Sequence, residues 1–353
     1  MLTNRENFIR NVRFEKPEWI PANVAINDAS WDLWRDDLAS VCMRFPQFFG
    51  TDIKPGWRDY DPYEFAPGYR KGEPFTDAWG CVWQTACNGI EGVVTHGPLA
   101  DWDLLPGFQS PDPETTGDRG PLDWPGFAQY GRLVKQGGDP FIGYLPHGFL
   151  FMRITYLRGF ENAMVDFAME APELDQLIEK LVAHNLALIH HFIAAGVDMV
   201  EFAEDLGSQE STILSPDLFR RYLKPAYHRL MEPCRQAGIL VGFHSDGKTL
   251  DILEDQIEAG VQRVNPQDLC NGIDNLARRI KGKACIQLDI DRQTIIPFGT
   301  AHDIDDLIRE EVMKLGSPNG GLEFIAGIYP PTPPQNVEAL CKALLKYQRY
   351  WWQ

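Results

Sequence analysis

The residues of this chain that are best suited to chemistry are a histidine and several acids that follow short apolar segments. In VGFHSDG, residues 241–247, an apolar run leads to His244 and Asp246 and then breaks at Gly247. Other apolar segments end in the same way, and the polar residues that follow them are His147, Glu201, Glu204, Asp205, Asn265, Gln267, Asp289 and Asp291.

Three interpretations of these residues stay open. Imidazole nitrogens and carboxylate oxygens suit zinc or a similar divalent ion. Crowded carboxylates raise one another's pKa, so one of them can stay protonated and act as an acid. Finally, the acids can be structural and cap the helices that follow, an interpretation that fits Asp205, just before Gly207 and Ser208.

The elements that must position these residues are strands and helices in alternation. From residue 141 onward the expected strands are FIGYLP, VDMVEFAED, ILVGFH, VQRVNP, ACIQLDID and LEFIAGI, with amphipathic helices between them. Short connections between alternating strands and helices predict parallel strands with right-handed crossovers. WIPANVAI near residue 22 and FGTDIKP near residue 52 bring the expected strands to eight.

Eight such units favour an α/β fold of the closed (β/α)8 TIM-barrel type over an open doubly wound sheet. The absence of a G-x-G-x-x-G motif after the first strand also argues against a dinucleotide-binding sheet. A barrel of this kind has its active site at the C-terminal strand ends, where the polar residues above fall. Residues 1–353 are expected to form one domain, in which loop-rich insertions at 28–140 cover the barrel mouth.

Several helix ends can be predicted from the sequence. Thr3 and Glu6 form a capping box ahead of an N-terminal helix. Pro172 opens a long helix that Gly196 ends, and Ser215 is the expected N-cap of another. The histidines within the long helix, His184, His190 and His191, are interpreted as ordinary helix residues.

Further residues are candidates for substrate binding. The predicted set is His147, Tyr156, Gln209, Asn265, Trp31 and Asp52. The tryptophans at 31, 34, 57 and 79 are expected mainly to pack loops onto the barrel, with the alternative that some line a pocket for an aromatic ring or a methylated cation. Arg153 and Arg158 are candidates to contact a carboxylate substrate, with a helix-surface role as the alternative.

Composition and charge indicate which partners and which cellular compartment this chain suits. The net charge of −17 and the lack of a basic run make nucleic acid an unfavourable partner. Seven cysteines, none in a C-x-x-C pair, favour reduced thiols in a cytoplasmic protein over a disulfide framework. The N-terminus has no apolar signal core, and no apolar window is long enough to span a membrane, so no membrane partner is expected.

Segments spread along the chain resemble the uroporphyrinogen decarboxylase superfamily. The matching segments are RENFIRNVRFEKPEWIP, FTDAWGCVWQ, EDLGSQESTILSPDLFRRYLKPAY, GFHSDG, GVQRVNPQ, DIDRQTIIPFGT and PPTPPQNVEAL. The resemblance runs from about residue 3 to 350 and implies a (β/α)8 barrel. It also favours a homodimer, because the decarboxylases of this superfamily are dimers.

The resemblance further implies a choice between two activities. True decarboxylases carry an arginine-containing RQAGR-type stretch near the N-terminus, whereas the matching PANVAINDASWDLW has no arginine before Arg35. The sequence is more similar to the methyltransferases that work with corrinoid proteins. Coenzyme-M-type members of that branch bind zinc through His-x-Cys and a distant Cys, and the matching positions here are His244, Asp246 and Ile328.

The leading hypothesis is therefore methyl transfer from a small methylated compound, a methyl ether or methylamine, to a corrinoid (cobalamin) carried by a partner protein. His244, Asp246, Glu204 and Asp289 are the predicted catalytic residues. His244, Asp246 and Glu204 are the predicted ligands if zinc is bound, and a metal-free site with carboxylates as proton donors is the alternative. The competing hypotheses are a decarboxylase or lyase acting on a small carboxylate and a catalytically silent barrel that binds a small molecule.

Overall fold

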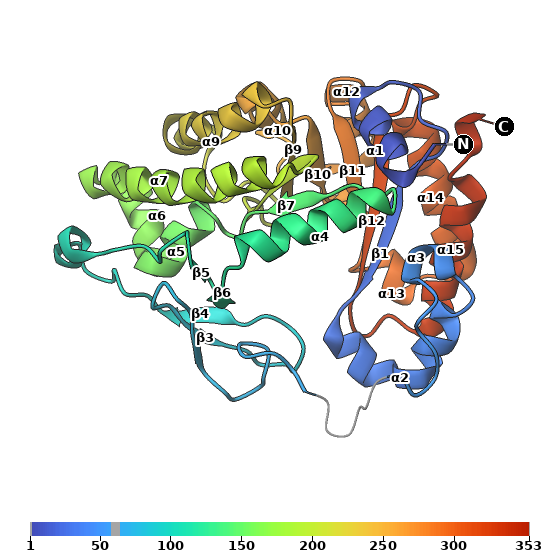
Figure 1. Ribbon diagram of the computed structural model, residues 1–353, viewed down its shortest axis with the longest axis horizontal. Coiled ribbons are helices and arrows are strands. Elements are labelled where there is room, and N and C mark those ends of the chain that lie inside the picture. The colour runs from blue at the N-terminus through green and yellow to red at the C-terminus, as the bar shows by residue number, and fades with distance from the viewer. Residues whose placement is uncertain (1, 58–63, 353) are drawn as a thin grey trace.

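The centre of the molecule is a curled sheet of seven parallel strands, seen in a computed structural model that describes residues 2–57 and 64–352. The strand order is β1-β12-β11-β10-β9-β8-β7, with every neighbouring pair parallel (Figure 1). The strands are β1 Ala22–Ile26, β7 Ile142–Tyr144, β8 Met199–Asp205, β9 Leu240–Asp246, β10 Arg263–Pro266, β11 Cys285–Asp289 and β12 Leu322–Ile328.

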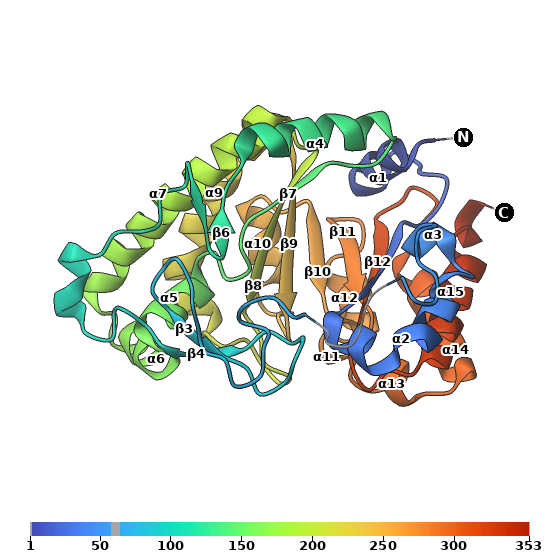
Figure 2. The same cartoon turned by 60° about the horizontal axis from the view of Figure 1, so that its bottom comes forward.

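Helices cover the outside of this sheet, as the alternating pattern predicts (Figure 2). The longer ones are α1 Asn4–Arg13, α5 Phe151–Arg158, α6 Phe160–Met169, α7 Pro172–Ala195, α9 Lys224–Gln236, α14 Ala301–Leu315 and α15 Pro334–Tyr347. Shorter ones follow individual strands: α8 Pro216–Leu218 with the π-helical turn Phe219–Leu223, α10 Leu253–Ala259, α11 Asp268–Asn271, α12 Ile273–Arg279 and α13 Ile295–Phe298. The predicted α/β barrel-like architecture is confirmed.

The predicted helix ends are confirmed as well. Thr3 and Glu6 form the capping box of α1, and the Ser215 side chain accepts a hydrogen bond from the N–H of Leu218. The long helix α7 ends at Gly196, whose φ of 74° is the left-handed conformation that glycine adopts without strain.

The eighth strand, predicted at FGTDIKP, is wrong. Residues 50–54 are irregular and follow the short helix α3 Pro46–Phe49. Thr51 and Asp52 are both exposed, so the segment has no alternating buried face to present to a sheet. Among the described residues, β1 and β7 are therefore the two edges of the sheet, and the barrel does not close between them.

Residues 28–140 contain more regular structure than their weak periodicity predicts. They include the helices α2 Asp28–Cys42 and α4 Trp124–Gln136, capped by the side chains of Asn27 and Asp123. They also include the antiparallel strands β2 Phe75–Thr76, β3 Val82–Gln84 and β4 Val93–His96, the 3-10 helix η1 Trp102–Gly107, and the hairpin β5 Thr116–Gly117 and β6 Gly120–Pro121. Figure 2 shows β3, β4 and α2 on the side toward which the central strands point.

No helix of the described chain is both long and apolar enough to cross a membrane. The helices instead bury one face against the sheet: in α14, for example, the residues at positions 304, 307, 308, 311, 312 and 315 are buried.

One of these buried positions, Glu311, is an acid. It is fully buried and interacts with Asp268 at the start of α11, which is also buried. If both groups were ionised, neither Glu311 oxygen would have a hydrogen-bond donor among the described residues. Burial and the neighbouring carboxylate raise the pKa of Glu311, so a proton on Glu311 supplies the bond to Asp268.

This pair predicts a loss of stability as pH rises. Burial raises the pKa of Asp268 to about 6, so the folded chain holds protons that the unfolded chain has released by about pH 5. The proton on Asp268 contributes its full stabilisation below about pH 4, the ordinary pKa of an aspartate in the unfolded chain. As pH rises from there to about 6, the pKa in the folded chain, the free energy of unfolding falls by about 1.4 kcal/mol for each pH unit. In Glu311→Gln the side-chain amide N–H donates the hydrogen bond to Asp268 in place of the carboxyl proton, and this N–H does not titrate.

Urea unfolding between pH 4 and 8 tests this. The variant should lose less free energy of unfolding than the wild type over this range, and Glu161→Gln, at an exposed position of α6, should behave as the wild type does. A parallel pH dependence of wild type and Glu311→Gln would contradict a shared proton.

Candidate active site

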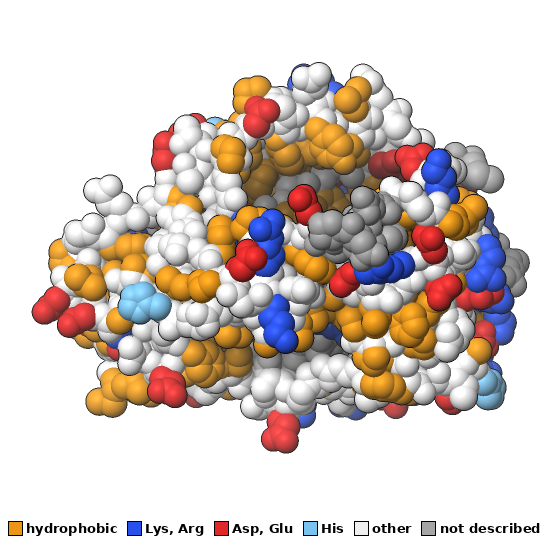
Figure 3. Space-filling view, turned by 90° about the horizontal axis from the view of Figure 1, so that it is seen from below, with side chains coloured by type: hydrophobic (Ala, Val, Ile, Leu, Met, Phe, Trp, Pro, Cys, Tyr) orange, Lys and Arg blue, Asp and Glu red, His pale blue; other side chains and the backbone are white. Residues whose placement is uncertain are grey.

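A cavity of about 780 Å³ lies inside the curled sheet. It extends from residues near the N-terminal strand ends, such as Phe8 and Trp19, to His244, Asp289 and Tyr329 at the C-terminal ends. Barrels of this type usually fill their interior with layers of side chains. Figure 3 shows a hollow in one face of the molecule, with hydrophobic and acidic side chains at its edge.

The deeper part of the cavity wall is an ion cluster. The Arg263 guanidinium lies 2.5 Å from a Glu201 oxygen and 3.0 Å from a Glu323 oxygen, with all three side chains less than 10% exposed. Gln287 donates a further hydrogen bond to Glu323 at 2.9 Å. The buried cation therefore offsets part of the cost of burying two carboxylates.

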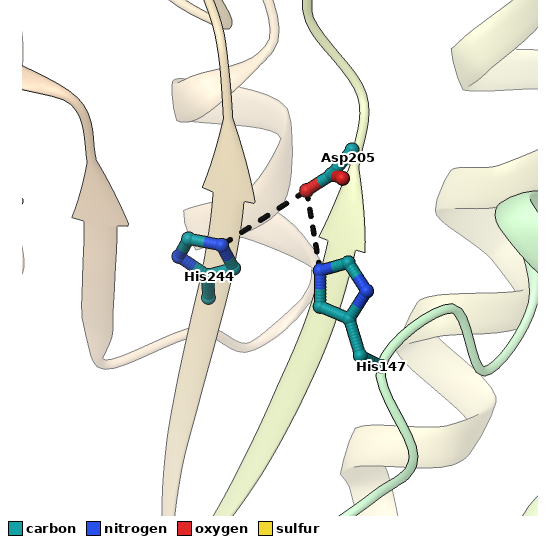
Figure 4. A group of neighbouring side chains, drawn as sticks. All are labelled: His147, Asp205 and His244. Carbon is teal, nitrogen blue, oxygen red and sulfur yellow. Dashed lines mark hydrogen bonds and ion pairs between the residues drawn. The ribbon is translucent and has the colours of Figure 1, made fainter. Parts of the chain in front are cut away.

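Above this cluster, three side chains from neighbouring elements converge (Figure 4). His147 follows β7, Asp205 ends β8, and His244 lies near the end of β9. The His147 Nε2 atom is 3.2 Å from Asp205 Oδ1, and His244 Nε2 is 4.0 Å from the same oxygen. One nitrogen or oxygen atom from each residue lies within 4.8 Å of the others, a spacing that allows all three to bind one metal ion.

The orientation of His244 is set by the next strand. Its Nδ1 atom is 2.5 Å from the side-chain oxygen of Asn265, and the Asn265 amide in turn donates to the backbone carbonyl of Gln287 at 2.6 Å. An amide oxygen can only accept, so Nδ1 of His244 carries a proton, and Nε2 is the nitrogen that faces Asp205. Such a support is typical of histidines that bind metals.

The carboxylate and the imidazole in this group stabilise each other's charge. Burial alone would lower the pKa of His147, but its hydrogen bond to Asp205 and nearby acids raise that pKa above the ordinary value. Burial alone would raise the pKa of Asp205, but His147 and His244 lower it below the ordinary value. The contact thus favours a protonated His147 beside an ionised Asp205.

Asp246 and Asp289 lie beside this group and share a cation. Asp246 Oδ1 is 3.4 Å from His244 Nε2, and it also accepts hydrogen bonds from Gln267 and Arg292. Arg292 lies 3.5 Å from Asp289 and over the ring of Tyr329. Burial raises the pKa of Asp289 to about 6, although Arg292 acts in the opposite direction.

Glu204, predicted as a catalytic residue and metal ligand, is directed elsewhere. Its carboxylate is fully buried and accepts hydrogen bonds from the backbone N–H groups of Leu150, Phe151 and Met152, at the start of α5. Successive side chains of a strand point to opposite faces, so Asp205 faces the cavity when Glu204 faces the helices. The structure thus brings Asp205, and not Glu204, into the histidine group.

The remaining predicted binding residues are dispersed. Tyr156 packs edge-on against Trp83, 4.9 Å between ring centroids, and its hydroxyl is 3.7 Å from Met152 sulfur. Gln209 is exposed and lines a separate hollow of about 290 Å³ that also includes Asp289. Trp31 is buried against Trp57, and Asp52 lies in the exposed irregular segment after α3.

The arginines considered as carboxylate anchors are both held in ion pairs. Arg153 is buried between Asp77 and Asp118, and Arg158 pairs with Asp166 at 2.8 Å. Their guanidinium groups also lie over the rings of Trp79 and Trp102. They fasten the segment 77–118 to α5 rather than face the central cavity.

Two residues of the site are missing from the predicted catalytic, substrate-binding and metal-ligating sets. The sequence favours a helix-cap role for Asp205, although strict alternation from Glu201 through Ala203 places it on the cavity face of β8. Arg292 has no local signal, because it follows the strand end in an irregular loop and its role depends on Asp246, which is 46 residues away.

More than half of the chain matches a known protein family. Residues 149–347 match the family model described as uroporphyrinogen decarboxylase (URO-D). The chain belongs to the uroporphyrinogen decarboxylase family. The matched segment contains the strands β8 to β12, and with them Asp205, His244, Asn265 and Asp289.

Two relatives in this family are named uroporphyrinogen decarboxylase and come from two strains of Thermus thermophilus. They are 31% and 30% identical to this chain over 222 residues, which is 58% of this chain and 57% of the relatives' own length. The chain thus spans a little over half of the length of these relatives.

A structural neighbour covers nearly the whole chain. It is a methyltransferase from Methanosarcina mazei with a TM-score of 0.64, covering 98% of this chain and 99% of its own, at 16% sequence identity. At this identity the likeness establishes the fold that this URO-D family member shares with the methyltransferase.

The position of Glu204 generates a prediction about stability. In Glu204→Gln only one side-chain oxygen remains to accept from three backbone N–H groups, so at least one buried donor at the start of α5 loses its partner. The free energy of unfolding should fall by about 1–3 kcal/mol.

Chemical denaturation of the purified variant measures this effect. Glu210→Gln, at an exposed position on the following turn, is the matched control and should change the stability by less than about 0.5 kcal/mol. Equal stabilities of the two variants would contradict the helix-start role of Glu204.

Proposed function

We propose that this URO-D family member is a methyltransferase that moves a methyl group from a small methylated compound to a corrinoid held by a partner protein. The observation that carries the proposal is the convergence of His147 and Asp205 on His244, which lines the cavity. The donor set of two imidazoles and one carboxylate matches that of catalytic zinc sites, which keep a fourth position for a substrate.

The chain's own residues suit such a site. Asn265 holds the Nδ1 proton of His244, so Nε2 is available as a ligand, and Asp205 is already ionised. A zinc ion bound there would act as a Lewis acid on the oxygen, nitrogen or sulfur that loses the methyl group. His147, which is more exposed than His244, would complete the set from the loop after β7.

Asp289 is the proposed general acid or base at the same cavity. Its pKa of about 6 keeps a fraction of the carboxyl protonated near neutral pH, and its Oδ2 atom has no hydrogen-bond partner among the described residues. Arg292 bridges Asp289 and Asp246, and Asp246 lies 3.4 Å from Nε2 of His244. A protonated Asp289 is thus placed to stabilise the leaving group of the methyl donor, with or without a metal.

The charge of the cavity favours a neutral or cationic methyl donor over a carboxylate. Of the arginines that line it, Arg263 already pairs with Glu201 and Glu323, and Arg292 already pairs with Asp246 and Asp289. The third, Arg349, lies at the opposite end of the cavity over Trp19. An anionic substrate at the mouth would have to compete with these internal acids for its cation.

The second candidate function is decarboxylation of a small carboxylate. It is favoured by the names of the two Thermus relatives, which share about 30% of their aligned residues with this chain. Arg292 is then the residue that would hold the carboxylate, because it is the cation nearest the histidine group among those lining the cavity.

Substrate assays separate the two candidates. The purified chain is mixed with a reduced corrinoid protein and a panel of methyl ethers, methylamines and methyl thioethers, and loss of the cobalt(I) absorbance is followed. Methyl transfer requires this loss with at least one donor, and Asp289→Asn should slow it by about 10²–10⁴-fold. Carbon dioxide release from carboxylates without any change at cobalt would favour decarboxylation instead.

Metal analysis tests the site itself. Wild-type protein equilibrated with zinc and desalted should retain about one ion per chain. His244→Ala, His147→Ala and Asp205→Ala each remove a ligand and should lose it, and Asn265→Ala should weaken zinc binding about 10–100-fold because Nδ1 of His244 loses its support.

His190→Ala, which removes an exposed histidine of α7, is the matched control and should retain the metal. Full zinc retention in both His147→Ala and His244→Ala would contradict this ligand set. A loss of zinc in Glu204→Gln with normal folding would favour the ligand set expected from the sequence.

A further inference from the structure

One aromatic side chain stands open to the central cavity. Tyr144 comes from the edge strand β7, lines the cavity, and is 63% exposed. Its register partner on β8 is Glu201, and paired residues of neighbouring strands point to the same face of a sheet, here the inside of the curl. Its hydroxyl accordingly lies within electrostatic reach of Glu201, Arg263 and Glu323.

Three of the other aromatic rings that line the cavity are already covered by a cation. In each case a guanidinium carbon lies 5.3 or 5.4 Å from the ring centroid, and the pairs are Arg263 with Phe8, Arg292 with Tyr329 and Arg349 with Trp19. Among the described residues, no Lys or Arg lies over the ring of Tyr144 in this way. The electron-rich face of this ring is therefore available to a cation from outside the chain.

The acid next to Tyr144 leans away from its ring. Glu201 pairs with Gly242 of β9, and a Cβ atom at Gly242 would lie only 2.0 Å from a Glu201 oxygen. The missing side chain at Gly242 thus lets Glu201 reach across β9 to Arg263, at 2.5 Å. Because Glu201 extends toward β9, it does not cover the ring of Tyr144 on β7.

The ion cluster beside Tyr144 has more acids than bases. Glu201 and Glu323 share the single guanidinium of Arg263, and all three residues line the cavity. When both acids are ionised, the cluster therefore carries a surplus negative charge. Burial raises the pKa of Glu201, although Arg263 acts in the opposite direction, so a cation in the cavity would favour the ionised form.

We infer that this part of the cavity binds a small organic ammonium group, which packs on the ring of Tyr144 beside the cluster of Glu201, Arg263 and Glu323. An aromatic face with negative charge nearby is the combination that recognises alkylammonium ions.

The position of this site fits it to anchor one end of a methyl donor. On β9, the register partner of Glu201 is Gly242, two residues and about 7 Å along the strand from His244. A donor held by its ammonium group would therefore reach the histidine group with its methyl-bearing end. This role as the substrate anchor rests on the proposed function, whereas binding of the ammonium group does not.

Choline and 3,3-dimethylbutanol are matched probes, because in the alcohol a neutral carbon replaces the charged nitrogen of choline and the shape is kept. Calorimetric titration of the purified full-length chain at pH 8 should show saturable binding of choline, with the alcohol about tenfold weaker.

Two variants test the residues. Tyr144→Leu keeps an apolar side chain and removes the aromatic face, so choline should bind only as well as the alcohol does. Glu201→Gln keeps an acceptor for Arg263 and removes the surplus charge, so it should weaken choline about fivefold and leave the alcohol unchanged. Tyr130→Leu, at a 61% exposed position of α4 that does not line the cavity, is the matched control and should bind as the wild type does.

The inference is overturned if choline shows no saturation in the millimolar range, if the alcohol binds equally well, or if Tyr144→Leu keeps the preference for choline. These titrations need no corrinoid, so the two proposals can fail separately. Selective choline binding by a chain that is inactive toward cobalt(I) would contradict only the methyl transfer. Methyl transfer from a neutral ether by a chain that does not bind choline would contradict only the ammonium site.

Discussion

The candidate site depends on one contact, the carboxylate of Asp205 placed between the imidazoles of His147 and His244. Strand register creates it. In the parallel pair β8 and β9, Asp205 lies opposite Asp246 and Ala203 opposite His244, so the cavity-facing positions of both strands end at the same level. A shift of one residue in β8 would direct Glu204 inward and Asp205 toward the helices. Much of the remaining structure stabilises this register.

The polar side chains in the interior below the site also support this contact. The sheet has an open edge between β1 and β7 among the described residues, and a cavity lies inside its curl. Its wall holds the cluster of Arg263, Glu201 and Glu323, which is neutral to acidic overall. Nearer the mouth, Arg292 pairs in the same way with Asp246 and Asp289. Arg263 and Arg292 are already paired with acids. They therefore do not cancel the negative charge of the acids that raise the pKa of His147.

Membership in the URO-D family establishes the barrel but not the reaction, since one fold hosts many chemistries. The proposed methyl transfer rests on the residues at the strand ends. Two imidazoles with an ionised carboxylate offer nitrogen and oxygen ligands, and a neighbouring carboxyl with a pKa of about 6 offers a proton. The same side chains would be of less use to an enzyme that must hold a highly anionic substrate, because such an enzyme needs unpaired cations at its mouth.

The sequence by itself determined the elements and their order. Its alternation of apolar strands with amphipathic helices, the capping box at Thr3, and the stop at Gly196 are local signals, and they predicted the fold class and the strand ends that hold His244, Asn265 and Asp289. It also placed His147 among the candidate residues. These features can be predicted because propensity, periodicity and capping act over a few residues.

Only the tertiary structure decided which of these residues meet. The choice between Glu204 and Asp205 depended on which face of β8 turned inward, and the partners of Arg153, Arg158 and Arg292 lie between 3 and 76 residues away. The segment FGTDIKP has strand-like residues but found no neighbouring strand to pair with, so it stayed irregular. Pairing, burial and charge compensation are long-range effects, and the free energy of each depends on neighbours that the local sequence does not specify.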